Sequence, residues 1–262
     1  MALDNFIVPL FVPGNRPERF EKAAASGADA IIIDLEDAVP AEAKDAARAA
    51  LKADFTGLPV IVRVNGEGTP WHTDDIAAVS KMPLAALIVP KAEMGGGLAA
   101  LAAGLQLPVL PLVESAQGLS QAREIAALPG VMRLVFGSVD FCADLGCAHT
   151  REALLAARSE LVLASRLAGL PAPVDGVTTS IDNSELIKSD AHYGLELGFG
   201  GKLAIHPRQI EAIRSGFRPQ PSEIAWAKKI LASGDGACAV DGAMVDEPVR
   251  IRARSILARV VG

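Results

Sequence analysis

Charged and polar side chains recur directly after short apolar segments of this sequence, and they are of the types that move protons and bind metals. The set comprises Arg16, Glu36, Asp37, Arg63, Lys91, Glu114, Asp140 and His206, with Gly137 and Ser138 just ahead of Asp140. Any one of them has an ordinary structural explanation, such as a helix cap or a surface ion pair. Their repetition indicates a shared site, because charged groups are rarely buried unless they are paired or bound to a metal.

The carboxylates in this set predict a hard cation. Magnesium prefers oxygen ligands, typically one or two carboxylates together with waters and substrate oxygens. Glu114 and Asp140 follow consecutive apolar segments and are the pair we expect to meet on one Mg²⁺ ion. Glu36 and Asp37 are then placed to orient its waters.

The cysteines do not offer a competing metal site. Cys142, Cys147 and Cys238 are three in number, and no second Cys/His pair lies near the first two. A zinc site needs about four such ligands. We therefore expect three reduced thiols, as in a cytoplasmic protein.

The basic residues narrow the reaction type. Arg16 and Arg63 could bind a substrate carboxylate or carbonyl bidentately. A magnesium ion and an arginine together could hold an enolate oxygen while a carbon–carbon bond breaks or forms. A Schiff base on Lys91 is an alternative route to the same bond. No cofactor-binding motif supports hydride transfer.

The apolar segments that precede these residues have the length and composition of buried strands. The predicted strands are Ile7–Val12, Ala30–Asp34, Val60–Val64, Ala86–Val89, Val109–Leu112, Leu134–Phe136, Val174–Gly176 and Lys202–Ala204. Amphipathic, alanine-rich segments alternate with them. The predicted helices are Glu18–Ser26, Ala41–Ala53, Thr73–Ser80, Gly97–Ala103, Gly118–Leu128, Arg151–Ala168, Asn183–Leu197 and Arg208–Ser215.

This alternation predicts an α/β protein with a parallel sheet. Eight units in 262 residues favour a closed (β/α)8 TIM barrel, whose active site lies at the carboxyl ends of the strands. The alternative is a Rossmann-type sheet, which typically has the motif G-x-G-x-x-G after its first strand. The sequence at that point is Pro13-Gly14-Asn15-Arg16-Pro17, which lacks the motif. The run Gly95-Gly96-Gly97 lacks that spacing and is interpreted as a flexible loop.

The chain is expected to have two parts. Residues 1–218 form the predicted barrel, and residues 219–262 form a C-terminal helix and lid segment. Within the second part, Pro219–Ser233 and Glu247–Val261 have helical patterns, and the glycine-rich stretch Gly234–Gly242 separates them.

Composition excludes several classes of partner. The net charge is −6 with acidic and basic residues interspersed, so there is no basic stripe for a nucleic acid. No apolar run is long enough to span a membrane, and the first five residues lack the features of a signal peptide. We expect a cytoplasmic protein that acts on a small molecule.

Several blocks of sequence match a known family in order. They are Pro9–Phe20, Ile33–Val39, Val62–Gly66, Val89–Lys91, Pro111–Ser115, Phe136–Phe141 and Ile205–Gln209. Together they resemble the citrate lyase β-subunit (CitE-like) branch of the HpcH/HpaI aldolase family. The blocks cover nearly the whole chain and are specific for the family, but much less so for a substrate.

The resemblance implies a barrel in which Glu114 and Asp140 hold Mg²⁺ and Arg63 contacts the carbonyl and carboxylate end of the substrate. It places Arg16, Lys91 and His206 toward a thioester carrier, usually coenzyme A. It also implies cleavage or formation of a β-hydroxyacyl thioester such as malyl-, citramalyl- or citryl-CoA, and assembly as a homotrimer or hexamer.

The tail resembles the lid of the same family. The stretch Asp241–Pro248 matches it, and Asp246 aligns with an aspartate that reaches a neighbouring subunit's site as an acid–base group. A plain helix N-cap is the alternative role for Asp246. Two other functions stay open at this point: a metal-dependent aldolase on free 2-oxo or hydroxy acids, and a subunit that works only within a lyase complex. Whether the carrier is coenzyme A, an acyl carrier protein or absent also stays open.

Overall fold

The apolar segments form one continuous parallel sheet in the computed structural model, which describes residues 5–95 and 97–261. Gly96, in the glycine run predicted to be a flexible loop, lies outside the described residues, as do residues 1–4 and 262. The chain separates into two compact units, residues 1–214 and 215–262.

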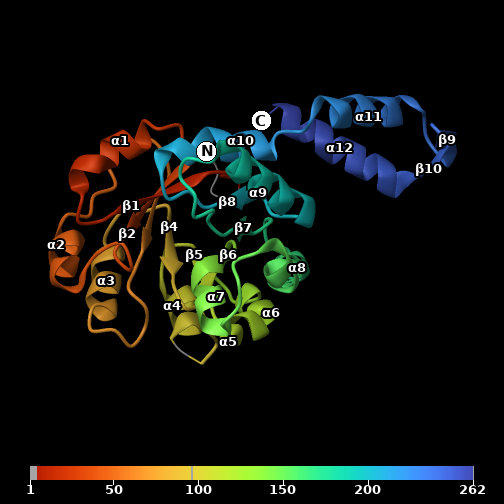
Figure 1. Ribbon diagram of the computed structural model, residues 1–262. Helices are drawn as coiled ribbons and strands as arrows, with labels where there is room; N and C mark the ends of the chain where they lie inside the picture. The colour runs from red at the N-terminus through yellow and green to blue at the C-terminus, as the bar shows by residue number, and fades with distance from the viewer. Residues whose placement is uncertain (1–4, 96, 262) are drawn as a thin grey trace. The chain divides into compact units, whose positions relative to one another are not determined.

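The first unit is a (β/α)8 barrel (Figure 1). Its strands are β1 (Pro9–Pro13), β2 (Ala30–Asp34), β3 (Val60–Arg63), β4 (Ala86–Val89), β5 (Val109–Val113), β6 (Val135–Phe136), β7 (Val174–Asp175) and β8 (Gly201–Lys202). They pair in sequence order, each parallel to the next. Just beyond β8, Ala204 exchanges backbone hydrogen bonds with Pro9 and Phe11 at 2.9 Å, which closes the ring. The predicted fold class is confirmed.

Alternate residues of the strands fill the barrel interior. The interior cluster includes Ala30, Ile32, Ile61, Ala86, Ile88, Leu110, Leu112, Val135, Val174 and Leu203. Successive side chains of a strand point to opposite faces, so the same row continues two residues further on. Beyond Ile32, Ile61 and Leu112 that row reaches Asp34, Arg63 and Glu114. The inward row therefore turns from apolar to charged where the strands end.

Helices surround the ring, as Figure 1 shows. They are α1 (Phe20–Ala24), α2 (Lys44–Ala49), α3 (His72–Val79), α4 (Leu98–Gly104), α5 (Ala116–Ser120), α6 (Ala122–Ala126), α7 (Ser138–Leu145), α8 (Arg151–Leu167), α9 (Ser184–Leu197) and α10 (Ile210–Phe217). Short 3-10 turns η1 (Pro17–Arg19), η2 (Ala41–Ala43) and η3 (Pro207–Gln209) precede α1, α2 and α10. The sequence did not predict α7, and the helix expected at Gly118–Leu128 is divided between α5 and α6.

A buried ionic cluster fastens α8 to the outside of the barrel. Asp175 on β7 accepts a hydrogen bond from Arg158 of α8 at 2.9 Å and one from Lys202 of β8 at 3.1 Å. All three side chains are buried. Burial alone would raise the pKa of Asp175, but the two cations lower it below its ordinary value. The buried Asp175 carboxylate is thus paired with two cations, and the cluster has a structural role.

The second unit is a helical pair joined by a β-hairpin. Helix α11 (Pro221–Ala232) packs on α12 (Glu247–Val261) around a small apolar core that includes Ile230, Val245 and Ile256. Strands β9 (Cys238–Val240) and β10 (Ala243–Val245) are antiparallel and joined by Asp241-Gly242. Both turn residues have positive φ, 51° and 77°, as a two-residue type I′ hairpin turn requires.

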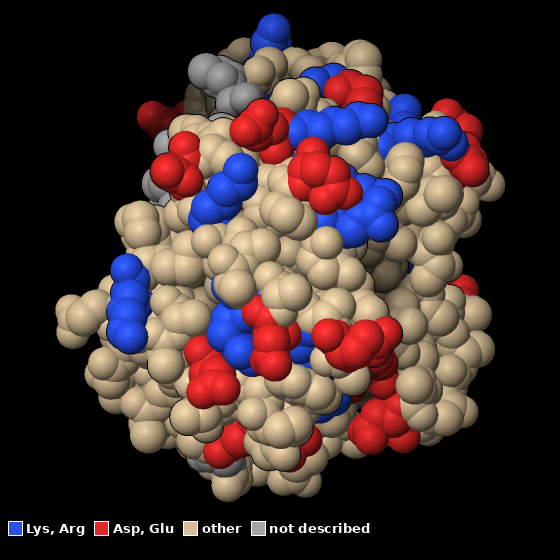
Figure 2. All heavy atoms as spheres, turned by 90° about the vertical axis from the view of Figure 1, so that its left-hand side faces the viewer, with Lys and Arg blue, Asp and Glu red and all other residues tan. Residues whose placement is uncertain are grey.

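The surface mixes charges of both signs. On the face shown in Figure 2, Lys and Arg side chains lie interspersed with Asp and Glu side chains. Among the described residues, no helix combines the length and the apolar character needed to cross a membrane.

Candidate functional site

A cavity of about 360 Å³ opens at the carboxyl ends of the barrel strands. Its polar wall comprises Asp34, Asp37, Arg63, Glu114, Gly137, Ser138 and Asp140. Apolar side chains form its floor and sides, namely Phe11, Leu112, Val177 and Leu203 from the barrel interior, with Phe136 and Ile205 beside them. An apolar cavity with a few convergent polar groups is typical of a small-molecule site.

Arg63 is held in one orientation by the strand next to it. Its Nε and Nη2 donate to the two carboxylate oxygens of Asp34, both at 2.7 Å, a bidentate pair across β2 and β3. Its Nη1 lies 2.9 Å from Glu36 Oε2 and 3.2 Å from Asp37 Oδ2. The Asp37 side chain is 59% exposed, so it is the most solvent-accessible of these three partners. The ring of Phe11 lies 5.0 Å from the guanidinium carbon.

Glu114 presents one buried oxygen to the cavity. Its Oε1 accepts a hydrogen bond from the backbone N–H of Lys91 at 2.8 Å. Its Oε2 is buried and has no hydrogen-bond partner among the described residues. A β-carbon placed on Gly137 would lie 2.5 Å from Cβ and Oε2 of Glu114, so only glycine leaves room for this carboxylate. A buried carboxylate oxygen without a donor is costly unless something else binds it.

Negative charge exceeds positive charge around the cavity. Five carboxylates interact here with two cations among the described residues: Asp34, Glu36, Asp37, Glu114 and Asp140 against Arg63 and Lys91. Burial and then the neighbouring Glu36 and Asp140 raise the pKa of Glu114 to about 8, against the opposing effects of the Lys91 N–H and Arg63.

The same excess of negative charge, together with burial, shifts the pKa values of Glu36, Arg63 and Lys91. Burial raises the pKa of Glu36 to about 7, although Arg63 opposes the shift. Burial alone would lower the pKa of Arg63, but Asp34 and Glu36 raise it further above its ordinary value. Lys91 behaves likewise, because Glu36 and Glu114 outweigh its partial burial and raise its pKa. A divalent cation would relieve the excess negative charge at this place.

The donor set fits magnesium better than a soft metal. Within the described part of the chain, no group of three or more His, Cys, Asp and Glu side chains is arranged to enclose an ion. Magnesium commonly takes only one or two carboxylates and completes its shell with water and substrate oxygens. The free oxygen of Glu114 and the neighbouring, exposed Asp140 would supply such a pair.

Asp140 lies in the first turn of α7, where the helix dipole favours negative charge. That helix begins at Ser138, whose side chain is 1% exposed. The segment after α7 returns toward its start, and His149 Nε2 lies 2.9 Å from Ser138 Oγ. The sequence singled out Ser138 but not His149.

A neighbouring cavity of about 370 Å³ contains the predicted His206. Arg19 and Lys22 line it as well, and it shares Phe11, Pro13 and Ile205 with the first cavity. Lys91 stands apart from it, with its ammonium 3.5 Å from Glu36 Oε1 and 63% of its side chain exposed. Arg16 lines neither cavity; it is exposed and pairs with Glu18 at 2.8 Å.

Asp246 belongs to the second unit. It directly precedes α12, and its Oδ1 accepts a hydrogen bond from the backbone N–H of Val249 at 3.4 Å. This is the geometry of a weak N-cap, one of the two roles expected for it. The side chain is partly exposed and keeps acceptor capacity for other partners.

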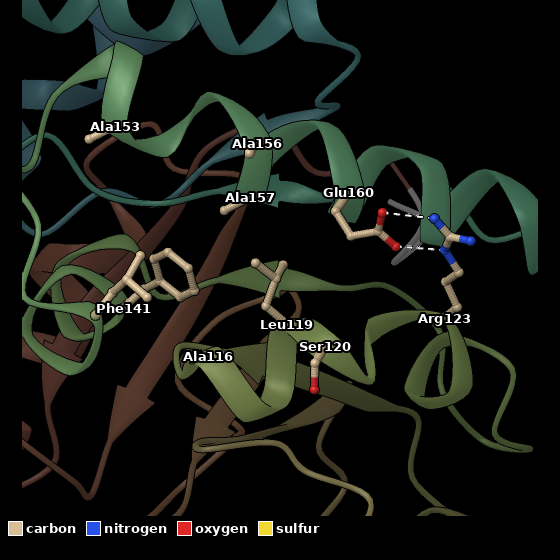
Figure 3. Close-up of a pocket in the computed structure, with 10 residues that line it drawn as sticks. Ala116, Leu119, Ser120, Arg123, Phe141, Ala153, Ala156, Ala157 and Glu160 are labelled. Atoms are coloured by element: carbon tan, nitrogen blue, oxygen red, sulfur yellow. Dashed lines mark hydrogen bonds and ion pairs between the residues drawn. The ribbon is translucent and has the colours of Figure 1, made fainter.

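A larger cavity, about 640 Å³, lies outside the barrel between α5–α7 and α8 (Figure 3). Its wall is mostly apolar and comprises four alanines with Leu119, Leu145 and Phe141. Its two charged residues satisfy each other, since Arg123 donates to both oxygens of Glu160 at 2.7 and 3.0 Å. It offers no uncompensated polar group to orient a substrate, so the smaller cavity is the candidate site.

Two parts of this site were missed from sequence. The Asp34–Arg63 pair depends on strand register, which no motif marks, although Asp34 ends an apolar run. Much of the apolar wall, including Phe11 and Leu112, could have been found by extending the alternation of each strand to its last residue.

The fold and the site define a class: a TIM barrel with a carboxylate-rich, arginine-containing pocket at the carboxyl ends of its strands. Within that class the chain belongs to the HpcH/HpaI aldolase/citrate lyase family, whose sequence profile matches residues 8–207.

Relatives extend the similarity over almost the full length. A citrate lyase subunit beta-like protein of Deinococcus radiodurans is 40% identical, with 95% of both chains covered. A (3S)-malyl-CoA thioesterase of Cereibacter sphaeroides is 37% identical over 95% of this chain and 93% of its own. CitE of Mycobacterium tuberculosis, solved with magnesium, acetoacetate and coenzyme A, has a TM-score of 0.90 and 36% identity, covering 98% of this chain and 99% of that one.

Proposed function

We propose that this protein is a magnesium-dependent carbon–carbon lyase, or the reverse Claisen-type enzyme, acting on a small β-hydroxyacyl-CoA such as malyl-, citramalyl- or citryl-CoA. The observation that carries the proposal is the buried, unpartnered Oε2 of Glu114 beside Asp140 and the fixed guanidinium of Arg63. The magnesium, acetoacetate and coenzyme A bound to the M. tuberculosis relative support the ligand class.

Each side chain then has a task. Glu114 and Asp140 hold Mg²⁺, which when bound supplies positive charge for an oxygen that becomes negative as the bond breaks. Arg63, fixed by Asp34, binds the carboxylate or carbonyl end of the substrate. The substrate then replaces Asp37 as a partner of the Arg63 guanidinium. The apolar wall around Phe11, Leu112 and Phe136 excludes water from the reacting carbons.

The thioester carrier is assigned to the neighbouring cavity. Arg19, Lys22 and His206 line it and suit an anionic carrier such as coenzyme A. Lys91, exposed and charged at the rim of the site, is proposed to stabilise the same carrier. Arg16 is proposed to reach it only after leaving Glu18.

Asp246 is proposed as the acid–base residue. In the lyase direction it accepts the hydroxyl proton of the substrate, and in the condensation direction it removes a proton from the carbon next to the thioester carbonyl. We propose that a neighbouring copy in a homo-oligomer supplies it, as the family resemblance of Asp241–Pro248 implies.

A second candidate function is hydrolysis of the thioester after or instead of carbon–carbon cleavage. The 37% identical (3S)-malyl-CoA thioesterase favours it. The two reactions differ in products: a lyase yields a shorter acyl-CoA and a 2-oxo acid, whereas a thioesterase yields free coenzyme A and a hydroxy acid.

The test is turnover of malyl-, citramalyl- and citryl-CoA with Mg²⁺ or with EDTA, followed by separation of acyl-CoA, free coenzyme A and 2-oxo acid. We expect Mg²⁺-dependent release of a shorter acyl-CoA by wild type and its loss in Asp246→Ala. Free coenzyme A without 2-oxo acid would establish the thioesterase instead. No turnover of any thioester by folded protein would move the assignment to a free-acid aldolase or a partner-dependent subunit.

A further inference from the structure

His149 contacts the wall of the candidate site from outside the cavity. Its Nε2 lies 2.9 Å from Ser138 Oγ, although eleven positions separate the two residues. The chain makes this approach because Gly146 ends α7 in the left-handed conformation and the next residues run back along the helix. The Cys147 N–H then donates to Cys142 O at 3.1 Å, and the segment continues into α8.

Ser138 has little freedom of its own. It is 1% exposed, and a β-carbon on Gly176 would lie only 2.1 Å from its Oγ. The hydroxyl thus lies close to the backbone of Gly176 and within hydrogen-bonding distance of the His149 imidazole. Both contacts act on the residue that begins α7.

That turn sets the spacing of the two proposed metal ligands. Gly137, one residue before Ser138, packs against the Glu114 side chain with no room for a β-carbon. Its backbone N–H also donates to Val113 O at 2.9 Å. Asp140 lies two residues after Ser138 in the same turn, so a shift of Ser138 moves Asp140 relative to Glu114.

We propose that His149 is a positioning residue: through Ser138 it holds the first turn of α7, and with it Asp140, at the place from which Asp140 and Glu114 share one magnesium ion. The inference rests on the proposed function, because it presumes that these two carboxylates bind Mg²⁺. It adds a residue of the α7–α8 connection to the site. Supporting groups behind metal ligands typically change metal affinity by about 10- to 100-fold when removed.

The experiment measures the Mg²⁺ dissociation constant by isothermal titration calorimetry. The variants are His149→Ala, Ser138→Ala, the double variant and His149→Gln, with His192→Ala on α9 as the matched histidine control. We expect each single alanine variant to weaken Mg²⁺ binding about 10-fold, at the low end because the contact is indirect. The double variant should be no weaker than either single one, because both remove the same hydrogen bond.

Two further readouts separate positioning from mere folding. His149→Gln keeps an amide donor at similar reach and should recover most of the affinity, and saturating Mg²⁺ should restore turnover in His149→Ala. A lowered melting temperature with an unchanged Mg²⁺ dissociation constant would overturn the inference, as would additive losses in the double variant. Failure of the wild type itself to bind Mg²⁺ would instead overturn the proposed metal site, and this inference with it.

Discussion

Glu114 illustrates how a proposed metal ligand can work against the stability of the fold that holds it. Its carboxylate is buried, one oxygen lacks a partner among the described residues, and its pKa is raised to about 8. In the unfolded chain a glutamate titrates near 4.5. Between these two pH values the folded protein binds more protons than the unfolded one, so the free energy of unfolding falls as pH rises.

Glu114→Gln should therefore stabilise the metal-free protein at high pH. In EDTA at pH 8 we expect the free energy of unfolding of the variant to exceed that of wild type by about 2–4 kcal/mol. This difference between variant and wild type should become smaller as the pH is lowered toward 5. Denaturant unfolding at several pH values checks this. Part of the wild-type trend should persist in the variant, because the pKa of Glu36 is also raised, to about 7. A variant less stable than wild type at pH 8 would contradict the assigned protonation behaviour.

At the scale of elements, the end of β4 contains an unusual backbone conformation. Lys91 has φ of 49°, which is left-handed and disfavoured for a residue with a β-carbon. This conformation directs its N–H to Glu114 Oε1 and so orients the free oxygen into the cavity. The strained backbone of Lys91 therefore lies at the candidate site, where such strain is commonly found in proteins.

Replacing Lys91 with glycine or alanine isolates that strain. Both variants lose the ammonium, but only glycine accepts positive φ freely. We expect Lys91→Gly to be more stable than Lys91→Ala by about 1 kcal/mol in urea unfolding. Both should keep the backbone hydrogen bond to Glu114 and bind Mg²⁺ alike. Equal stabilities would mean that the turn is not strained.

Sequence patterns predicted the elements better than their ends and contacts. Each of the eight predicted strands overlaps an observed one, mostly because the strands are apolar runs, as at Ala30–Asp34. Strand β8 (Gly201–Lys202) is the exception and overlaps its prediction at Lys202 alone. Helix α7 was missed because it begins at Ser138 without a side-chain cap and follows a two-residue strand, so its first turn looks like a polar strand end. The β9–β10 hairpin was interpreted only as a glycine-rich stretch, although Asp241-Gly242 is a typical hairpin turn.

Contacts between elements were harder to predict than the elements themselves. The family motif marked Arg63 and Glu114, but not the partners that fix them. Asp34 reaches Arg63 through the register of β2 against β3. His149 reaches Ser138 through the path of a connection. Both depend on three-dimensional packing that a one-dimensional pattern does not contain.

At the scale of the whole molecule, the proposed chemistry is divided between two units. Glu114 lies in residues 1–214 and Asp246 in residues 215–262. If Asp246 acts in the site of a neighbouring copy, then one copy can supply the metal ligands and another the acid–base group. Activity should then depend on assembly as well as on folding.

A complementation experiment tests this arrangement. Glu114→Gln and Asp246→Ala should each be inactive alone. After mixing, dissociation and reassembly, a fraction of sites combines an intact Glu114 with an intact Asp246, and we expect measurable turnover to return. The double variant Glu114→Gln/Asp246→Ala mixed with Asp246→Ala is the control and should stay inactive. No recovery in a mixed oligomer, confirmed by mass, would place Asp246 in its own chain's site or outside catalysis.

The barrel interior and the candidate site share one alternation of side chains: Ile32 and Asp34 on β2, Ile61 and Arg63 on β3, and Leu112 and Glu114 along β5. One residue inserted in such a strand would turn the charged group outward and bring its neighbour inward. Substitutions can therefore reshape this pocket gradually, whereas a change of strand length would dismantle core and chemistry together. Descendants of this sequence are free to vary in length in the connections, and it is there that new specificities can be added.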